Sequence, residues 1–209
     1  MTKNLVIVFV KNTKLGSVKT RLAKTIGDFA ALEVYKALLK VTQNAISELD
    51  ADTHIYFSKE IETNTWTNHK KQLQQGKDLG ERMLNAFKDG FNSGYKNIIL
   101  IGSDLPDISS FHIENGFKSL QKSKVVFGPA EDGGYYLVGM SNLVKDIFCN
   151  KPWSQPSLLE ETLQELHTLN VSVSKLETLN DIDTYEDLIA SDFYKNNQQL
   201  QEKIRQFHD

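Results

Sequence analysis

The sequence predicts an α/β fold: a single Rossmann-like domain with a mostly parallel central sheet flanked by helices. Residues 5–10 and 97–101 contain uninterrupted apolar, β-branched runs, which are typical of strands buried on both faces. Strand-like and helix-like segments alternate along the chain, which implies crossover connections and parallel pairing. The 209 residues are close to the length of one domain at ~150 residues per domain. We expect one domain over residues 1–209, with 192–209 as a C-terminal helical extension.

The predicted strands are short apolar segments bounded by polar or turn-forming residues. They cover residues 5–10, 53–57, 97–101, 124–127, 135–140 and 171–175. The two strongest runs are expected at the centre of the sheet, because central strands have no face open to solvent. Ligands of such sheets bind beyond the carboxyl ends of the strands, so the loops after residues 10 and 101 are expected to carry the chemistry.

The predicted helices follow from apolar stripes and from capping signals. They cover residues 29–49, 78–92, 111–121, 157–170 and a closing group from 184 to about 207. Asp28 is expected to cap the first helix, and Asp78 with Glu81 spells a capping box for the second. Asp183 with Glu186 spells another capping box at the start of the closing helices.

Charge and composition exclude several classes of protein. The net charge is −3, but residues 1–27 hold six basic residues and no acid, which leaves −9 on the remainder. A short basic segment on an acidic body suits a small anionic ligand better than a nucleic acid, which needs a basic face. A lone Cys149 cannot form an internal disulfide or a zinc cluster. The longest apolar runs span about six residues, too few for a membrane span or a secretion signal, so we expect a cytoplasmic protein.

The loop after the first predicted strand contains Lys11, Lys14, Gly16, Lys19 and Arg21. A turn that leads into a helix presents free N–H groups to anions, and an arginine can bind phosphate through two hydrogen bonds. The loop lacks the adjacent Gly-Lys-Ser/Thr of a Walker A motif and the three glycines of a dinucleotide fingerprint. These five residues are predicted to bind phosphate groups; the alternative is a set of solvated lysines.

Asp104 follows the buried segment 97–101 almost directly. Mg²⁺ is usually held by one or two protein carboxylates and completes its shell with phosphate oxygens and water. Asp104 is therefore predicted to face the lysine loop and hold Mg²⁺ or Mn²⁺, with Asp181 or Asp183 as a further ligand. For Asp107, in the same segment, the alternative to a place in this site is that it caps the next predicted helix.

A glycine pair follows two acids in Glu131-Asp132-Gly133-Gly134. Two glycines permit positive φ or the close approach of a ligand, and a carboxylate beside them is a candidate general base. Asp132 is the first candidate and Glu131 the second; the alternative is a tight turn between two strands. The predicted acceptor pocket is lined by Gly133, Gly134, Tyr135 and Trp153. For Trp153, a place in the core is the alternative.

Six motifs in this order resemble one glycosyltransferase-A-like family over residues 5 to about 190. They are Lys14-x-Gly16-x-x-Lys19-Thr-Arg-Leu, Gln74-x-Gly76-x-Asp78-Leu-Gly-Glu-Arg82-Met, Gly102-Ser-Asp-x-Pro-Asp107, Gly128-Pro-Ala-x-Asp-Gly-Gly-Tyr-Tyr-Leu137, Trp153-Ser154 and Asp181-Ile-Asp-Thr-x-Glu-Asp-Leu188. The family is labelled arsenosugar-biosynthesis or radical-SAM/selenodomain-associated glycosyltransferase. It usually has prolines where this chain has Asn12-Thr13-Lys14-Leu15.

The resemblance implies a nucleotide-diphospho-sugar transferase fold and a metal-dependent sugar transfer. A nucleotide-sugar donor would give its sugar to a small-molecule acceptor and release a nucleoside diphosphate, with the lysine loop and Asp104 on the diphosphate and its metal. Guanylyltransferases that act on phospholactate-type substrates share the Lys-x-Arg-Leu loop, but have Gly-Thr-Asn where this chain has Asp132-Gly-Gly-Tyr135. A nucleotidyl transfer that releases pyrophosphate, or a non-catalytic nucleotide-binding role, therefore stays open. The sugar, the base, the acceptor and the oligomeric state are left open as well.

Overall fold

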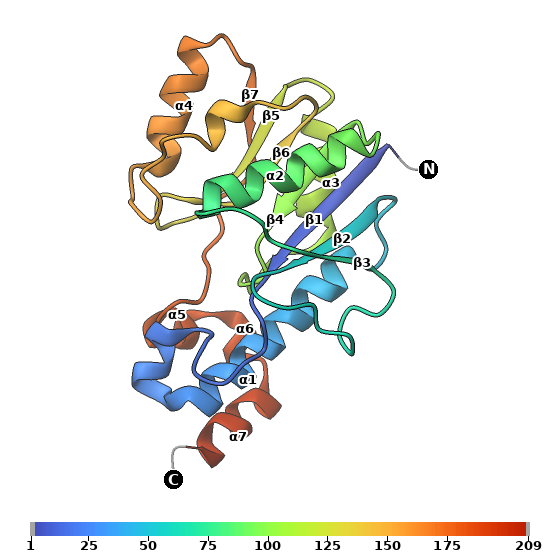
Figure 1. Cartoon of the computed structure of the whole chain (residues 1–209). Coiled ribbons are helices and arrows are strands. Elements are labelled where there is room, and N and C mark those ends of the chain that lie inside the picture. Colours follow the sequence, from blue (N-terminus) through green and yellow to red (C-terminus); the bar gives the residue numbers. More distant parts are fainter. Residues whose placement is uncertain (1–2, 208–209) are drawn as a thin grey trace.

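The computed structural model describes residues 3–207 and contains one seven-stranded sheet with helices on both faces (Figure 1). The strand order is β3-β2-β1-β4-β6-β5-β7, and β6 runs antiparallel to both of its neighbours. The strands are β1 (Asn4–Val10), β2 (Asp52–Phe57), β3 (Lys70–Leu73), β4 (Asn97–Ile101), β5 (Val125–Pro129), β6 (Tyr135–Met140) and β7 (Val173–Lys175). The predicted α/β class with a mostly parallel sheet is confirmed.

The two strongest apolar runs lie at the centre of the sheet, as predicted. β1 pairs in parallel with β2 on one side and with β4 on the other. Leu5 and Ile7 point to one face and Val6 and Val8 to the other, and all four are fully buried. An uninterrupted apolar run is required at this position because successive side chains of a strand enter opposite cores.

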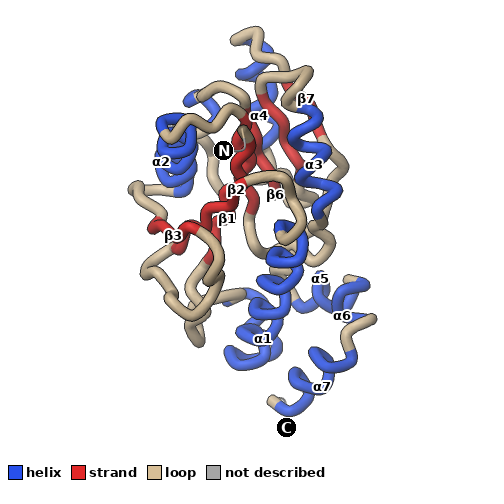
Figure 2. The backbone as a smooth tube through the Cα atoms, turned by 90° about the vertical axis from the view of Figure 1, so that its right-hand side faces the viewer, coloured by secondary structure: helices blue, strands red, loops and turns tan. Residues whose placement is uncertain are grey.

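Helices form a layer on each face of the sheet. α1 (Thr20–Ile46) and α3 (Ser110–Ser119) cover one face, whereas α2 (Leu79–Asn92) and α4 (Leu158–Thr168) cover the other. Figure 2 views the sheet from its edge, with α2 and α3 on opposite sides. Among the described residues, no helix is both long enough and apolar enough to span a membrane.

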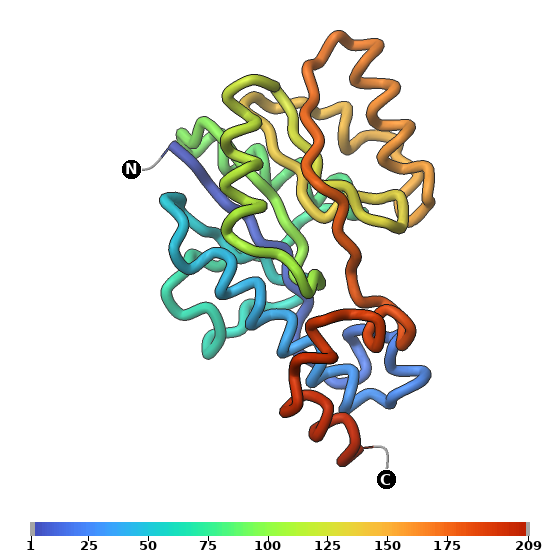
Figure 3. The backbone as a smooth tube through the Cα atoms, turned by 180° about the vertical axis from the view of Figure 1, so that it is seen from behind, coloured from blue at the N-terminus to red at the C-terminus, as the bar shows by residue number. Residues whose placement is uncertain are grey.

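The closing helices pack against the beginning of α1, beyond the carboxyl end of β1. They are α5 (Tyr185–Ala190), α6 (Asp192–Lys195) and α7 (Gln198–Gln206). Leu200 and Ile204 of α7 form a separate apolar cluster with Leu22 and Ile26 of α1. The chain after β7 descends from the sheet to α5 (Figure 3), which brings the segment around residue 183 to the basic loop. Residues 208–209 of the predicted extension lie outside the described residues.

The structure corrects the predicted helix starts. The helix predicted over 29–49 is the second part of α1, which begins at Thr20 and is interrupted at Gly27 (φ 80°, ψ 160°). The capping box at α5 is formed by Thr184 and Asp187, one residue later than the predicted Asp183 and Glu186. Threonine takes the cap because the Asp183 carboxylate is ion-paired with basic side chains of another segment.

One strand was missed in the prediction. β3 has the sequence KKQL and no buried residue, so it lacks the apolar signal on which strand prediction depends. It lies at the edge of the sheet, where charged side chains are common because one side of the strand faces water.

Candidate active site

The loops that follow β1 and β4 meet at the carboxyl edge of the sheet. The Asp104 carboxylate, after β4, lies 3.0 Å from Lys19 Nζ and 3.8 Å from Lys11 Nζ, both from the loop after β1. Burial by itself would raise the pKa of Asp104, but the ammonium groups of Lys19 and Lys11 outweigh burial and hold that pKa below its usual value. Asp104 is therefore an ionised carboxylate at the centre of the site.

Lys19 is a buried lysine between two carboxylates. Its side chain is only 1% exposed, and its Nζ lies 3.5 Å from Asp183 as well as 3.0 Å from Asp104. Its backbone is left-handed, with φ 48°, directly before the first turn of α1. A non-glycine residue holds this conformation only when its surroundings over-determine it, and here the two ion pairs do so.

The other basic residues of the loop lie nearer to solvent. The Arg21 guanidinium is 70% exposed and lies 3.2 Å from Asp183, and the Lys11 side chain is 56% exposed. Lys14 and Gly16 lie on the exposed outer part of the loop, and Gly16 has φ 70°. Charges in such positions can reach a ligand that lies over the sheet edge.

Hydrogen bonds hold the loop after β1 in place, although it lacks the prolines that are usual in the family it resembles. The Asn12 side chain donates to the carbonyl of Glu60 (2.7 Å) and accepts from the N–H of Lys59 (3.0 Å). The N–H of Thr13 donates to a carboxylate oxygen of Glu62 at 2.7 Å. The Tyr35 hydroxyl on α1 accepts from the N–H of Lys11 at 2.8 Å. The segment after β2 and the helix thus fix the loop on both sides.

A cavity of about 320 Å³ opens beside Asp104, and we call it the acceptor cavity after the pocket predicted from the sequence. Its apolar wall includes Phe9, Leu79, Met83, Tyr135, Trp153 and Leu158. Its carboxylates are Asp104, Asp132 and Asp181. Burial, together with the negative charges of Asp183, Asp132 and Asp104, raises the pKa of Asp181 to about 6, although Lys19 opposes the shift.

The glycine pair lies in the turn between β5 and β6, which is the alternative that the sequence left open, and the space beside Gly133 is filled by the chain rather than left for a ligand. A Cβ on Gly133 would lie 2.0 Å from the carbonyl oxygen of Pro156, and φ is +86°. The absent side chain therefore makes room for the chain itself, which also accounts for the hydrogen bond from the N–H of Leu159 to the Gly133 carbonyl. Gly134 does line the acceptor cavity, and its N–H donates to Asp132 Oδ1 at 2.8 Å.

Asp132 and Glu131 differ in their access to the acceptor cavity. Asp132 is exposed and lines the cavity, whereas Glu131 is exposed and is not among the lining residues. Of the predicted pocket residues, Gly134, Tyr135 and Trp153 line it. The geometry thus ranks Asp132 above Glu131 as a base toward a ligand in this cavity.

The carboxylates offer oxygen donors to a divalent cation. Asp104 and Asp181 line the same cavity, and the raised pKa of Asp181 reflects its burial first and the neighbouring negative charges second. Asp183 is engaged by Lys19 and Arg21 instead. Within residues 3–207, no group of three or more His, Cys, Asp or Glu side chains is arranged to hold a metal. The donor set suits a cation that draws its remaining ligands from phosphate and water, as Mg²⁺ does.

Sequence reasoning predicted Tyr135 and Trp153 but missed the other residues of the apolar wall of the acceptor cavity. Phe9 belongs to the central strand β1, and Leu79 and Met83 lie in the first turns of α2. A signal was present: Leu79 and Met83 fall in the second of the six motifs, which carried no assigned role. Apolar residues beside a helix start look like core residues until the tertiary structure shows that they border a cavity.

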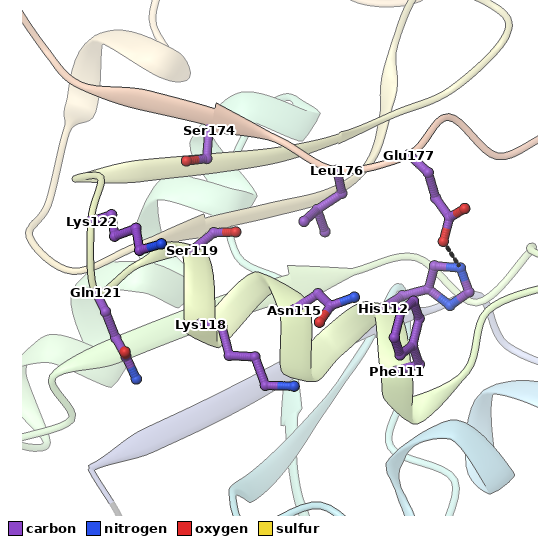
Figure 4. A pocket seen from close by; sticks show the side chains of 10 residues that line it. All are labelled: Phe111, His112, Asn115, Lys118, Ser119, Gln121, Lys122, Ser174, Leu176 and Glu177. Carbon is purple, nitrogen blue, oxygen red and sulfur yellow. Dashed lines mark ion pairs between the residues drawn. The ribbon is translucent and has the colours of Figure 1, made fainter.

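A second cavity, of about 710 Å³, lies between α3 and β7 (Figure 4). It contains the ion pair of His112 with Glu177 at 2.9 Å, and its Lys118 side chain is 66% exposed. None of the predicted site residues lines it. The acceptor cavity, which adjoins the carboxyl ends of β1 and β4, is the better candidate for the active site.

Comparisons with solved structures support the fold. The chain is similar to a "putative nucleotide-diphospho-sugar transferase" from Desulfovibrio desulfuricans G20, with 28% identity, a TM-score of 0.86 and 99% of each chain covered. The inositol-1-phosphate CTP transferase from T. maritima has the same fold at 14% identity, with a TM-score of 0.54 over 98% of this chain and 96% of that one.

Sequence comparison adds a curated relative and a family. The chain is 25% identical over 132 residues to the 2-phospho-L-lactate guanylyltransferase of Methanocaldococcus jannaschii, which covers 63% of this chain and 58% of that protein. The match thus spans less than two thirds of the relative's length. A family model described as "uncharacterized protein conserved in bacteria (DUF2064)" matches residues 41–155, more than half of the chain. This protein is therefore a member of the DUF2064 family.

Proposed function

We propose that this protein is a nucleotide-dependent transferase that moves a nucleotidyl group from a nucleoside triphosphate to a small acceptor. The observation that carries the proposal is the meeting of the basic loop with Asp104 at the carboxyl edge of the sheet, beside a cavity of small-molecule size. The similarity to a guanylyltransferase and to a CTP transferase supports nucleotidyl transfer over the sugar transfer that the sequence resemblance implies.

In this reaction an acceptor oxygen attacks the α-phosphorus, the bond to the β-phosphate oxygen breaks, and pyrophosphate leaves. Lys11 and Arg21 are exposed enough to contact the phosphates, whose charge they would stabilise as it develops. Lys19 is predicted from the sequence to bind the diphosphate, but its side chain is buried and paired with two carboxylates, so we propose that it keeps Asp104 ionised and in place instead. Asp132 lines the cavity and is proposed to accept the acceptor's proton.

A divalent cation, Mg²⁺ or Mn²⁺, is proposed as cofactor, with Asp104 and Asp181 as its protein ligands. When bound there, it would supply positive charge to the phosphates and to the leaving group. Asp183 is proposed to orient Arg21 and Lys19, with which it is already paired.

Sugar transfer is the second candidate. It is supported by the D. desulfuricans protein, which is named as a nucleotide-diphospho-sugar transferase and matches 99% of this chain. In that reaction the bond between the sugar and the diphosphate breaks, and a nucleoside diphosphate leaves. The same basic loop and the same Asp132 would serve, since both leaving groups are diphosphates and both acceptors lose a proton.

The leaving group decides between the two reactions. Purified protein would be incubated with each nucleoside triphosphate, or with a panel of nucleotide sugars, together with Mg²⁺ and a mixture of small hydroxyl and phosphate acceptors. We expect pyrophosphate from a nucleoside triphosphate and no nucleoside diphosphate from a nucleotide sugar. The opposite products would establish sugar transfer, and nucleotide binding without any product would indicate a binding protein.

Variants link the activity to the site. Asp104→Asn should abolish the dependence of nucleotide binding on Mg²⁺, and Asp132→Asn should abolish turnover while nucleotide binding persists. Glu131→Gln is the matched control, because Glu131 is adjacent and exposed but does not line the cavity. Full activity in Asp132→Asn would exclude Asp132 as the base.

A further inference from the structure

The acceptor cavity has two chemically distinct walls. Leu79 and Met83 from α2 and Trp153 from the segment before α4 contribute to the apolar wall. Asp104 and Asp132 contribute carboxylates to the polar side. At about 320 Å³, the cavity lies at the lower end of the size range of small-molecule sites, ~300–1,000 Å³.

Basic side chains balance only one of the carboxylates of this cavity: Asp104 is paired with Lys19 and Lys11, whereas Asp132 and Asp181 form no ion pair among the described residues. Among the described residues that line it, three are aspartates and none is lysine, arginine or histidine. The nearby Lys19 is buried and is already paired with Asp104 and Asp183. A divalent cation held by Asp104 and Asp181 would share its charge with the nucleotide phosphates, so Asp132 would remain a negative charge in the cavity.

We infer that the acceptor is a small molecule with an apolar body and no negative charge, either neutral or cationic. The inference rests on the proposed function only in calling this ligand the acceptor. It separates the chain from the guanylyltransferase relative, whose named substrate, 2-phospho-L-lactate, carries a phosphate and a carboxylate. An anion of that kind would lose its hydration to enter a cavity that offers it only like charges.

Tyr135 contributes an aromatic ring to the apolar wall. The residue lines the acceptor cavity, and its hydroxyl is buried without a hydrogen-bond partner among the described residues. Because this hydroxyl is closed off from solvent, the cavity meets the ring of Tyr135 rather than its hydroxyl. A ligand that is mainly apolar but carries one polar group would satisfy both walls.

Trp153 gives a direct readout of binding that needs neither nucleotide nor turnover. In the Trp66→Phe variant, Trp153 is the only tryptophan, and its fluorescence reports occupancy of the cavity. The probes are 2-phenylethylamine, 2-phenylethanol and 3-phenylpropionate, which share a ring but are cationic, neutral and anionic. We expect the first two to bind at least roughly tenfold more tightly than the third, with EDTA and with Mg²⁺.

A positive charge placed in the apolar wall should reverse the order of the probe affinities. Leu79 is 47% exposed and lines the cavity, so Leu79→Arg adds a cation without burying it in the core. Leu143→Arg is the matched control, because Leu143 is similarly exposed and does not line the cavity. Leu79→Arg should favour 3-phenylpropionate by roughly tenfold, while Leu143→Arg keeps the original order.

The same probes, and 2-phospho-L-lactate, would also be titrated into the unmodified protein by calorimetry. This measurement shows the order of affinities without any effect of Trp66→Phe on the fold. Tighter binding of 3-phenylpropionate or of 2-phospho-L-lactate than of the neutral probe would overturn the inference. Binding of none of the three phenyl probes would overturn it too. A failure of nucleotidyl transfer with this order of binding intact would count against the proposed function alone.

Discussion

At the carboxyl edge of the sheet, charged side chains are paired on the side of the basic loop and unpaired on the side of the acceptor cavity. On the loop side, Lys19 is buried between Asp104 and Asp183, and Arg21 lies against Asp183, so positive and negative groups are matched. On the cavity side, Asp132 and Asp181 face an apolar wall with no basic lining residue.

This difference separates charges that hold the fold from charges that are available to a ligand. A buried ion pair is costly to break, because the remaining partner is left in a medium of low polarity. An unpaired carboxylate at a cavity instead raises the energy of the empty protein, and a ligand or cation can relieve that cost. The following substitutions test this contrast.

Lys19→Met should have the largest effect. It leaves the low-pKa carboxylate of Asp104 with only the more distant Lys11 as a cation, and breaking a buried pair typically costs about 3–5 kcal/mol. Chemical denaturation at pH 7 would measure the free energy of unfolding. Lys24→Met, an exposed lysine of the same helix, is the control and should stay within about 0.5 kcal/mol of the unmodified protein. Equal effects of the two variants would show that burial of Lys19 has no energetic consequence.

Gly133→Ala tests whether the glycine turn serves packing. Its Cβ would meet the Pro156 carbonyl, and left-handed backbone adds a penalty, so we expect a loss of about 2–5 kcal/mol. Gly94 also has positive φ (+93°) but has open space around it, and Gly94→Ala should cost only about 1–2 kcal/mol. Thermal unfolding of both variants measures the difference. Similar losses would assign the whole effect to the backbone conformation.

Asp181→Asn should change the pH dependence of stability in metal-free protein. Because the pKa of Asp181 is raised to about 6 in the fold, ionisation destabilises the folded state as pH rises from about 4 through 6. Asparagine imitates the protonated form, so the variant should match the parent near pH 4 and be more stable at pH 8. Melting temperatures across this range in EDTA would measure the effect. A variant equally or less stable at pH 8 would contradict an unrelieved charge at this position.

Arg21→Ala should have the smallest effect on stability. The guanidinium is 70% exposed, and exposed ion pairs contribute about 0–1 kcal/mol. Nucleotide binding should nevertheless weaken by roughly tenfold or more, because a charge-assisted contact with phosphate is worth about 1.5–3 kcal/mol. Denaturation and nucleotide titration of one preparation would separate the two effects. Unchanged nucleotide affinity would make the Arg21–Asp183 pair purely structural.

The sequence by itself determined the parts of this protein that depend on local pattern. The apolar, β-branched runs of β1 and β4 predicted strands covered on both faces, and Asp78 does cap α2 by accepting from the N–H of Glu81. The motifs also marked the basic loop, Asp104 and the glycine turn as candidate site segments, because the first two follow predicted strands and the third lies between two of them.

Only the tertiary structure decided how those segments share their charges. The buried state of Lys19, its pairing with Asp183 more than 160 positions away, and the filling of the space beside Gly133 by Pro156 depend on contacts between distant segments. The same holds for the acceptor cavity, whose walls come from β1, α2, the β5–β6 turn and the start of α4. Burial and electrostatic pairing are properties of neighbours in space, and residue spacing along the chain does not specify them.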